Sequence, residues 1–167
     1  AVIFGKYFSL GFNRLSIIDL NKRAMQPFIS ADKKKILVFN GEIYNFKELR
    51  KLLEEKGHLF KSISDSEVIL HLYEEYGVEC VKYLEGMFAF SIYDEAVWCV
   101  FLVRVRVGIL LFYFSKYKDW FVFGSEIKAI EKSGVVPFEP DIDSYVTYLR
   151  HLCVPSDRTG NKNILKL

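Results

Sequence analysis

The sequence has few of the features that would assign a chain of 167 residues to a specialised class. It contains only three cysteines, Cys80, Cys99 and Cys153, and none of them lies in a Cys-x-x-Cys or Cys/His spacing. A disulfide framework and a cysteine-based zinc site are therefore not expected. A reducing, cytoplasmic setting fits this cysteine usage best.

Long apolar runs are also lacking. The most apolar region, 97–114, is interrupted by Arg104 and Arg106, so its pieces fall short of the ~20 residues that a membrane-spanning helix needs. The first five residues, Ala1 to Gly5, have neither the charged region nor the apolar core of a secretory signal and are expected to form a strand. No membrane partner is expected.

The chain has no strong charge of one sign. Lys and Arg number 23 against 21 Asp and Glu, and the densest basic run is Lys33-Lys34-Lys35. Because this run precedes the apolar stretch 36–39, it favours a solvated turn over a phosphate-binding patch. Nucleic acid is not an expected partner.

What the chain does have is a globular composition, with 51% hydrophobic residues, 15 Phe and 10 Tyr. The length favours one domain with a core. We expect that domain to span 1–152, and 153–167 to be a linker or the start of a passage to a further domain.

The hydrophobic periodicity predicts both strands and helices. Capping boxes of Asn45 with Glu48 and of Ser64 with Glu67 predict two helices, which stop at Gly57 and Gly77. Further helices are expected at 78–84, 125–132 and 141–152, and strands at 7–19, 35–39, 87–93, 97–104, 109–115 and 120–124. Since the connections are short and no repeat appears, the predicted fold class is α+β, with helices covering mostly antiparallel strands.

The first candidate for chemistry is Asn40-Gly41-Glu42, which we expect in a loop after the strand 35–39. An Asn amide and the N–H of a following Gly can stabilise an oxyanion, and Glu42 can accept hydrogen bonds from an ammonium group. The alternative is an ordinary turn, because Asn-Gly is a common turn pair.

Two other segments carry complementary groups. Arg14, in the strand-like run 14–19, suits bidentate binding of a carboxylate, although a structural salt bridge explains it equally well. Asp65 stands at the start of the second helix, where a carboxylate either complements the helix terminus or binds a substrate amine.

These runs, together with Glu85-Gly86-Met87-Phe88-Ala89-Phe90 and Gly124-Ser125-Glu126-Ile127-Lys128-Ala129, resemble the type-2 glutamine amidotransferase domain of asparagine synthetase. The resemblance follows the same order over nearly the whole chain. It implies an N-terminal-nucleophile hydrolase fold, a four-layer αββα sandwich with two mostly antiparallel sheets. It also implies hydrolysis of glutamine to glutamate and ammonia, for the ATP-dependent amidation of aspartate.

The resemblance also implies a site. Asn40 and Gly41 would form the oxyanion hole, and glutamine would lie against Arg14, Leu15, Ser16, Ile17, Ile18, Asn40, Gly41, Glu42 and Asp65. Free glutamine needs a cation for its carboxylate, anions for its ammonium group and donors for its amide oxygen. The residues named supply each of these groups.

The chain departs from the family pattern where the nucleophile is expected. Ala1 occupies the position of the family's catalytic Cys, and only Lys6 to Asn13 separate Gly5 from Arg14, where the family has a longer loop. Three explanations compete, namely a natural loss, an engineered Cys-to-Ala substitution and residues missing from the sequence, and the last best explains both departures together. The alternative function is a catalytically inactive glutamine-binding or scaffold module. Val105, Leu110 and Leu111 are further departures, in a segment where the family has Arg-Asp-Arg, Gly and then Pro.

The resemblance implies L-glutamine as ligand and a C-terminal synthetase domain or separate synthetase subunit as partner, and a homodimer is compatible with it. No metal and no cofactor are expected in this domain. ATP and Mg²⁺ are expected in the synthetase domain.

Overall fold

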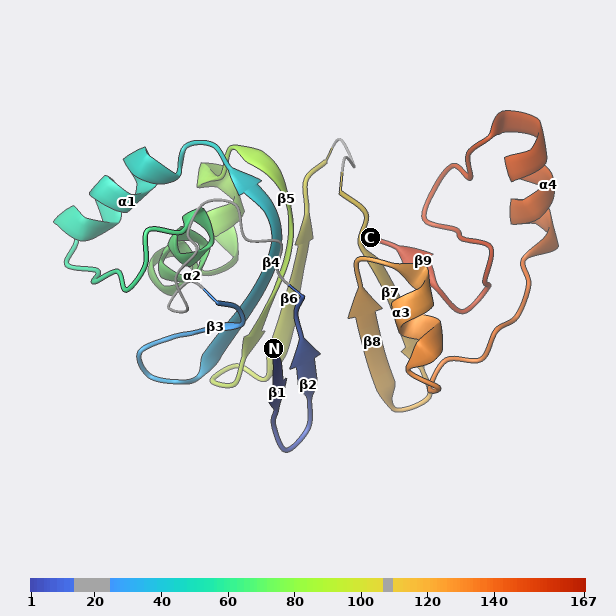
Figure 1. Cartoon of the computed structure of the whole chain (residues 1–167), viewed down its shortest axis with the longest axis horizontal. Helices are drawn as coiled ribbons and strands as arrows, with labels where there is room; N and C mark the ends of the chain where they lie inside the picture. The colour runs from blue at the N-terminus through green and yellow to red at the C-terminus, as the bar shows by residue number, and fades with distance from the viewer. Residues whose placement is uncertain (14–24, 107–109) are drawn as a thin grey trace. The chain divides into compact units, whose positions relative to one another are not determined.

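The computed structural model describes residues 1–13, 25–106 and 110–167 and divides the chain into two compact units. The first unit is Ala1–Ile109 and the second is Leu110–Leu167 (Figure 1). Among the described residues, no helix is long and apolar enough to cross a membrane.

The first unit is built on a four-stranded antiparallel sheet in the order β3-β4-β5-β6. Its strands are β3 (Phe28–Ile29), β4 (Lys35–Ile43), β5 (Gly86–Asp94) and β6 (Cys99–Arg104). The two longest strands pair over their whole length, from Lys35 opposite Asp94 to Ile43 opposite Gly86. The predicted strand at 97–104 begins two residues late, because Trp98 has a positive φ of 53° in the turn before it.

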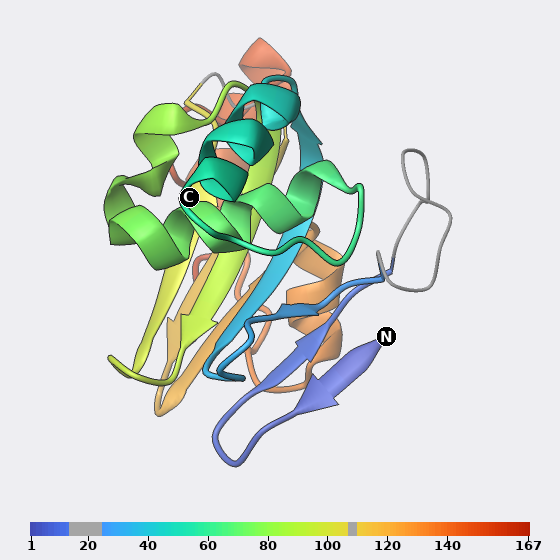
Figure 2. The ribbon, with the colours of Figure 1, turned by 90° about the vertical axis from the view of Figure 1, so that its left-hand side faces the viewer.

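Helices α1 (Phe46–Glu55) and α2 (Asp65–Tyr76) cover one face of this sheet, followed by the 3-10 helix η2 (Gly77–Tyr83) (Figure 2). Side chains alternate between the faces of a strand, so every second residue of β4 and β5 is buried against the helices. The resulting core contains Leu37, Phe39, Ile43, Leu53, Val68, Ile69, Leu72, Phe88, Phe90 and Ile92.

Neither predicted capping box forms. Asn45 makes no side-chain bond to α1 and instead contacts the end of η2 and the residue before β5, donating to the carbonyl oxygen of Tyr83 and accepting from the N–H of Glu85. Ser64 does cap α2, but the carboxylate of Glu67 accepts from residues before the helix and does not close a box. Both helices nevertheless begin where they were predicted.

A hairpin of β1 (Val2–Phe4) and β2 (Ser9–Gly11) precedes the sheet. The N–H of Gly5 donates to the carbonyl oxygen of Phe8 in its turn, at 2.8 Å. The predicted strand 7–19 is therefore shorter where the structure describes it, and its part beyond residue 13 lies outside the described residues.

The second unit has a sheet in the order β8-β7-β9, made of β8 (Trp120–Gly124), β7 (Tyr113–Tyr117) and β9 (Leu165–Lys166). Helix α3 (Ile127–Lys132) packs on this sheet through Ile130, and α4 (Ile142–His151) follows. The segment 153–167 includes β9 and the buried residues Thr159, Asn161 and Ile164. Its role as a passage to a synthetase domain stays a prediction.

Candidate functional site

The structure places three of the predicted glutamine ligands in one strand, which corrects the expectation of a loop. Asn40, Gly41 and Glu42 belong to β4 and lie opposite Ala89, Phe88 and Met87 of β5. The strand continues past Phe39 because β5 offers nine residues to pair with, and Asn-Gly turn propensity does not outweigh this ladder. Arg14, Leu15, Ser16, Ile17 and Ile18 lie outside the described residues.

The pairing pattern decides which way the backbone of Gly41 faces. Gly41 lies opposite Phe88 of β5. The carbonyl oxygen of Phe88 is directed away from β4, because it accepts from the N–H of Val105 at 2.9 Å. In an antiparallel ladder, such a pair exchanges no hydrogen bonds. The N–H and C=O of Gly41 are thus directed to the free edge of β4, beyond the part of the strand that β3 covers.

The same edge is closed by side chains on both sides of Gly41. Two residues earlier, Gln26 acts like a short strand: its amide donates to the carbonyl oxygen of Phe39 at 2.9 Å and accepts from the N–H of Phe39 at 2.6 Å. Two residues later, the Oδ2 atom of Asp65 accepts from the N–H of Ile43 at 3.0 Å. Between these contacts, the described residues offer Gly41 no partner on this edge.

The part of β4 that carries the candidate site, residues 40–42, is exposed to solvent. Asn40, Gly41 and Glu42 are all exposed, whereas strict alternation would bury one of them. Gly41 has a φ of 137°, in a region that a side chain rarely adopts. Gly86 lies so close to the strand that a Cβ atom there would overlap the carbonyl oxygen of Glu42. The local backbone conformation therefore favours glycine at position 41, and the close approach of β5 to β4 requires it at position 86.

Asp65 is brought to the strand by α2, of which it is the first residue. Its side chain is buried, with residue exposure of only 4%, and it also receives the hydroxyl of Ser64 at 3.4 Å. A carboxylate can accept about four hydrogen bonds, so these two leave capacity for a ligand. The structure thus gives Asp65 a positioning contact that neither sequence interpretation anticipated.

Gln26 is the residue that the sequence did not single out. It lies in a polar, proline-containing stretch and contacts a strand 13 residues away in the sequence, with an exposure of only 5%. A side chain that replaces a neighbouring strand leaves no periodic signal. Only the folded arrangement reveals it.

Ala1 stands at the end of the β1–β2 hairpin. Its ammonium group donates to the carbonyl oxygen of Phe12 at 2.7 Å, and its own carbonyl oxygen accepts from the N–H of Phe12 at 2.8 Å. A cavity of about 500 Å³ lies beside this hairpin, lined in part by Phe4, Tyr7 and Trp98. Its lining includes none of the described glutamine ligands.

Of the three cysteines, Cys80 is fully buried in the core of the first unit. Burial raises the pKa of its thiol to about 12, so it stays protonated and is a poor nucleophile. Cys99 is half-buried in β6, and Cys153 is exposed in the second unit. No described hydrogen bond joins any of the three cysteines to Asn40–Glu42.

A second polar cluster lies on α2. Burial lowers the pKa of His71, but hydrogen bonding and charge from Glu67 and Glu74 outweigh burial and raise it to about 9. Burial acts against the ionised form of Glu67, yet bonds from the side chains of His71 and Ser62 and from two backbone N–H groups hold its pKa down at about 2. This cluster is separate from the edge of β4 and was not predicted.

Comparison with known proteins assigns the chain. Residues 2–167 match the family described as "Glutamine amidotransferase domain". The chain belongs to this family. Asparagine synthetase [glutamine-hydrolyzing] 3 of Bacillus subtilis is 38% identical over 99% of this chain and 25% of its own length. Asparagine synthetase [glutamine-hydrolyzing] 2 of Oryza sativa is 43% identical over 72% of this chain and 20% of its own length.

The chain thus spans about a quarter of the length of the first of these relatives. Among solved structures, the glutamine phosphoribosylpyrophosphate amidotransferase of Bacillus subtilis has a TM-score of 0.60 and 25% identity, over 72% of this chain and 29% of that one. These findings confirm both the resemblance stated from the sequence and the α+β fold class of an N-terminal-nucleophile hydrolase sandwich. They do not test the individual site residues, which stay predictions.

Proposed function

We propose that this domain binds L-glutamine and hydrolyses it to glutamate and ammonia, which an ATP-dependent synthetase domain or subunit uses to amidate aspartate. The observation that supports this most directly is the free edge of β4 at Gly41, held between Gln26 and Asp65. A fixed backbone N–H is the kind of preorganised donor that stabilises an oxyanion without reorganisation during the reaction.

The other groups of glutamine find partners nearby. The exposed amide of Asn40 is the second donor for the oxyanion, and the carboxylates of Glu42 and Asp65 suit the α-ammonium group. Arg14 is the proposed partner of the α-carboxylate. A ligand without the ammonium group leaves the two carboxylates unpaired, so the site favours an amino acid over a simple amide.

The nucleophile belongs, by resemblance, to the position of Ala1, whose methyl group cannot attack an amide. The proposed hydrolysis therefore requires a Cys thiol at this position, and with Ala there the domain binds glutamine without hydrolysing it. Hydrolysis in this domain needs no metal and no cofactor, since acyl transfer to a thiol uses only the nucleophile, a base and the oxyanion hole. ATP and Mg²⁺ are proposed for the synthetase domain.

The experiment measures glutamine binding by calorimetry and ammonia release by a coupled assay, on the whole protein to which this domain belongs. We expect Asn40→Ala to lower kcat by roughly 10²–10³-fold, which is the usual effect of losing one oxyanion-hole donor. Glu42→Gln should instead weaken glutamine binding by about tenfold or more, since a hydrogen bond to a charged group contributes about 1.5–3 kcal/mol.

Glu48→Gln is the matched control, because Glu48 lies on α1 and should change neither quantity. Glutamine binding without ammonia release in the whole protein would support the inactive binding module. No detectable binding at millimolar glutamine would refute both functions.

A further inference from the structure

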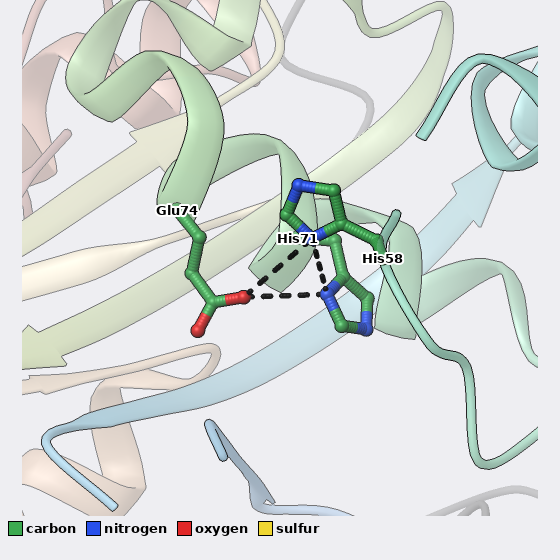
Figure 3. A group of neighbouring side chains, drawn as sticks. All are labelled: His58, His71 and Glu74. Atoms are coloured by element: carbon green, nitrogen blue, oxygen red, sulfur yellow. Dashed lines mark hydrogen bonds and ion pairs between the residues drawn. The ribbon is translucent and has the colours of Figure 1, made fainter. Parts of the chain in front are cut away.

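Two of the three histidines in the chain lie together with a glutamate (Figure 3). His58 is in the segment that follows α1, whereas His71 and Glu74 are one turn apart on α2. The Nδ1 atoms of the two histidines are 3.1 Å apart. The Oε2 atom of Glu74 is 3.3 Å from Nδ1 of His71 and 4.0 Å from Nδ1 of His58.

These separations are those of atoms around a common metal ion. Zinc binds imidazole nitrogen and carboxylate oxygen at about 2.0–2.2 Å, which places neighbouring ligands of a tetrahedron roughly 3.3–3.6 Å apart. The separation of 3.3 Å lies at the edge of this range, the separation of 3.1 Å is slightly shorter, and the separation of 4.0 Å is slightly longer. All three residues are half-buried.

The outward nitrogens of both rings also face carboxylates. Nε2 of His58 is 3.3 Å from Oε2 of Glu75, and Nε2 of His71 is 3.8 Å from Oε1 of Glu67. Histidines that bind metals almost always have such an outer partner, which fixes the ring and directs the other nitrogen to the metal. Glu67 is itself held by the backbone N–H groups of Lys61 and Ser62, at 2.9 and 2.8 Å.

We propose that Nδ1 of His58, Nδ1 of His71 and Oε2 of Glu74 form a binding site for a divalent transition-metal ion, best suited to Zn²⁺. Imidazole ligands favour Zn²⁺ over Mg²⁺ and Ca²⁺, which prefer oxygen. The ion would tie the segment between the two helices to α2 and so stabilise the helix that carries Asp65. This inference is independent of the proposed glutamine hydrolysis.

The competing arrangement is a proton in place of the metal, shared between the facing Nδ1 atoms of His58 and His71. Both arrangements satisfy the distances between these atoms, but only one of them binds a metal in stoichiometric amounts. Metal titration therefore separates them without reference to enzyme activity.

The experiment titrates the chelator-treated whole protein with Zn²⁺ by calorimetry and with Co²⁺ by visible absorption, in a Cys153→Ser background that removes the exposed thiol. We expect this domain to bind one equivalent, with a Co²⁺ spectrum of nitrogen and oxygen ligands and no thiolate charge-transfer band. His58→Ala, His71→Ala and Glu74→Gln should each lower the affinity by more than about tenfold, since even outer partners contribute roughly 10–100-fold.

Two further variants make the test specific. Glu75→Gln should lower the affinity by roughly tenfold through the orientation of His58. His151→Asn is the control, because this third histidine is exposed on α4 and should leave the affinity unchanged. If His71→Ala does not fold, His58→Ala and Glu74→Gln decide the question. Absence of a bound equivalent, or an affinity that these two substitutions leave unchanged, would overturn the proposal.

Discussion

Replacing Gln26 by Met removes the side-chain amide that occupies the edge of β4 beside the site. Its two hydrogen bonds to the backbone of Phe39 are buried, at 2.9 and 2.6 Å, and Met keeps a similar length without donor or acceptor. A buried peptide group without a partner costs about 1–3 kcal/mol, and two such groups arise here. Since Met recovers part of this through apolar burial, we expect a loss of about 2–4 kcal/mol in the free energy of unfolding.

The chain supplies its own control for this substitution. Asn45 also uses one amide to join a carbonyl oxygen and an N–H group, those of Tyr83 and Glu85, but these bonds are exposed. Water replaces them when they are lost, so Asn45→Leu should cost less than about 1 kcal/mol.

The assay is urea denaturation of both variants, with thermal melting in parallel. At this chain length, 1 kcal/mol corresponds to roughly 2–4 °C, so Gln26→Met should lower Tm by roughly 5–15 °C. Amide exchange should show lost protection at Phe39 in Gln26→Met alone. Equal losses of stability in Gln26→Met and Asn45→Leu would contradict the role given to the buried amide of Gln26.

Three other substitutions test separate parts of the structure. Gly86→Ala should destabilise the protein by more than about 3 kcal/mol and reduce glutamine binding. The new Cβ would overlap the carbonyl oxygen of Glu42, and the φ of Gly86 is 156°, which a side chain rarely adopts. Unchanged denaturation and binding would contradict this prediction. Ile130→Ala, at a fully buried position, should lower the free energy of unfolding by about 2–5 kcal/mol in chemical denaturation. A loss below about 1 kcal/mol would contradict this, because it would mean that the neighbouring side chains fill the space that Ile130 leaves. Bonds from Ser30 and a backbone N–H lower the pKa of Asp32 from 3.8 to about 2. The stabilisation of the folded protein by the ionised Asp32 is therefore complete above pH 3.8 and is lost as the pH falls toward 2. Asp32→Asn should therefore be less stable than the wild type at neutral pH, with a difference that shrinks between about pH 4 and 2. A difference in stability that does not change with pH would show that the ionised carboxylate of Asp32 is not its source.

Much of the fold follows from local pattern. The amphipathic spacing of Leu49 and Leu53 predicts α1, and Ser64 marks the start of α2, because helix periodicity and capping act within a few residues. The register of β4 and β5 did not follow in the same way. The sequence ends the strand at Phe39, whereas pairing with β5 extends it to Ile43.

For the candidate site too, the sequence indicates the residue types but not their arrangement in space. The residue types needed for glutamine, an Asn-Gly pair and three charged side chains, are visible in the sequence and carry its resemblance to the amidotransferase family. Their arrangement is not, because Asp65 reaches Ile43 across 22 residues and Gln26 reaches Phe39 across 13. Short-range patterns contain no information about contacts over such separations.

The sequence by itself therefore determined the family and the α+β class, and it contains the residue types on which the proposed chemistry rests. Only the tertiary structure decided that Gly41 presents its N–H at a free strand edge, and that His58 meets His71 and Glu74. Composition and periodicity depend on the nearest few residues, whereas strand register and side-chain clusters depend on packing between segments that are distant in the sequence.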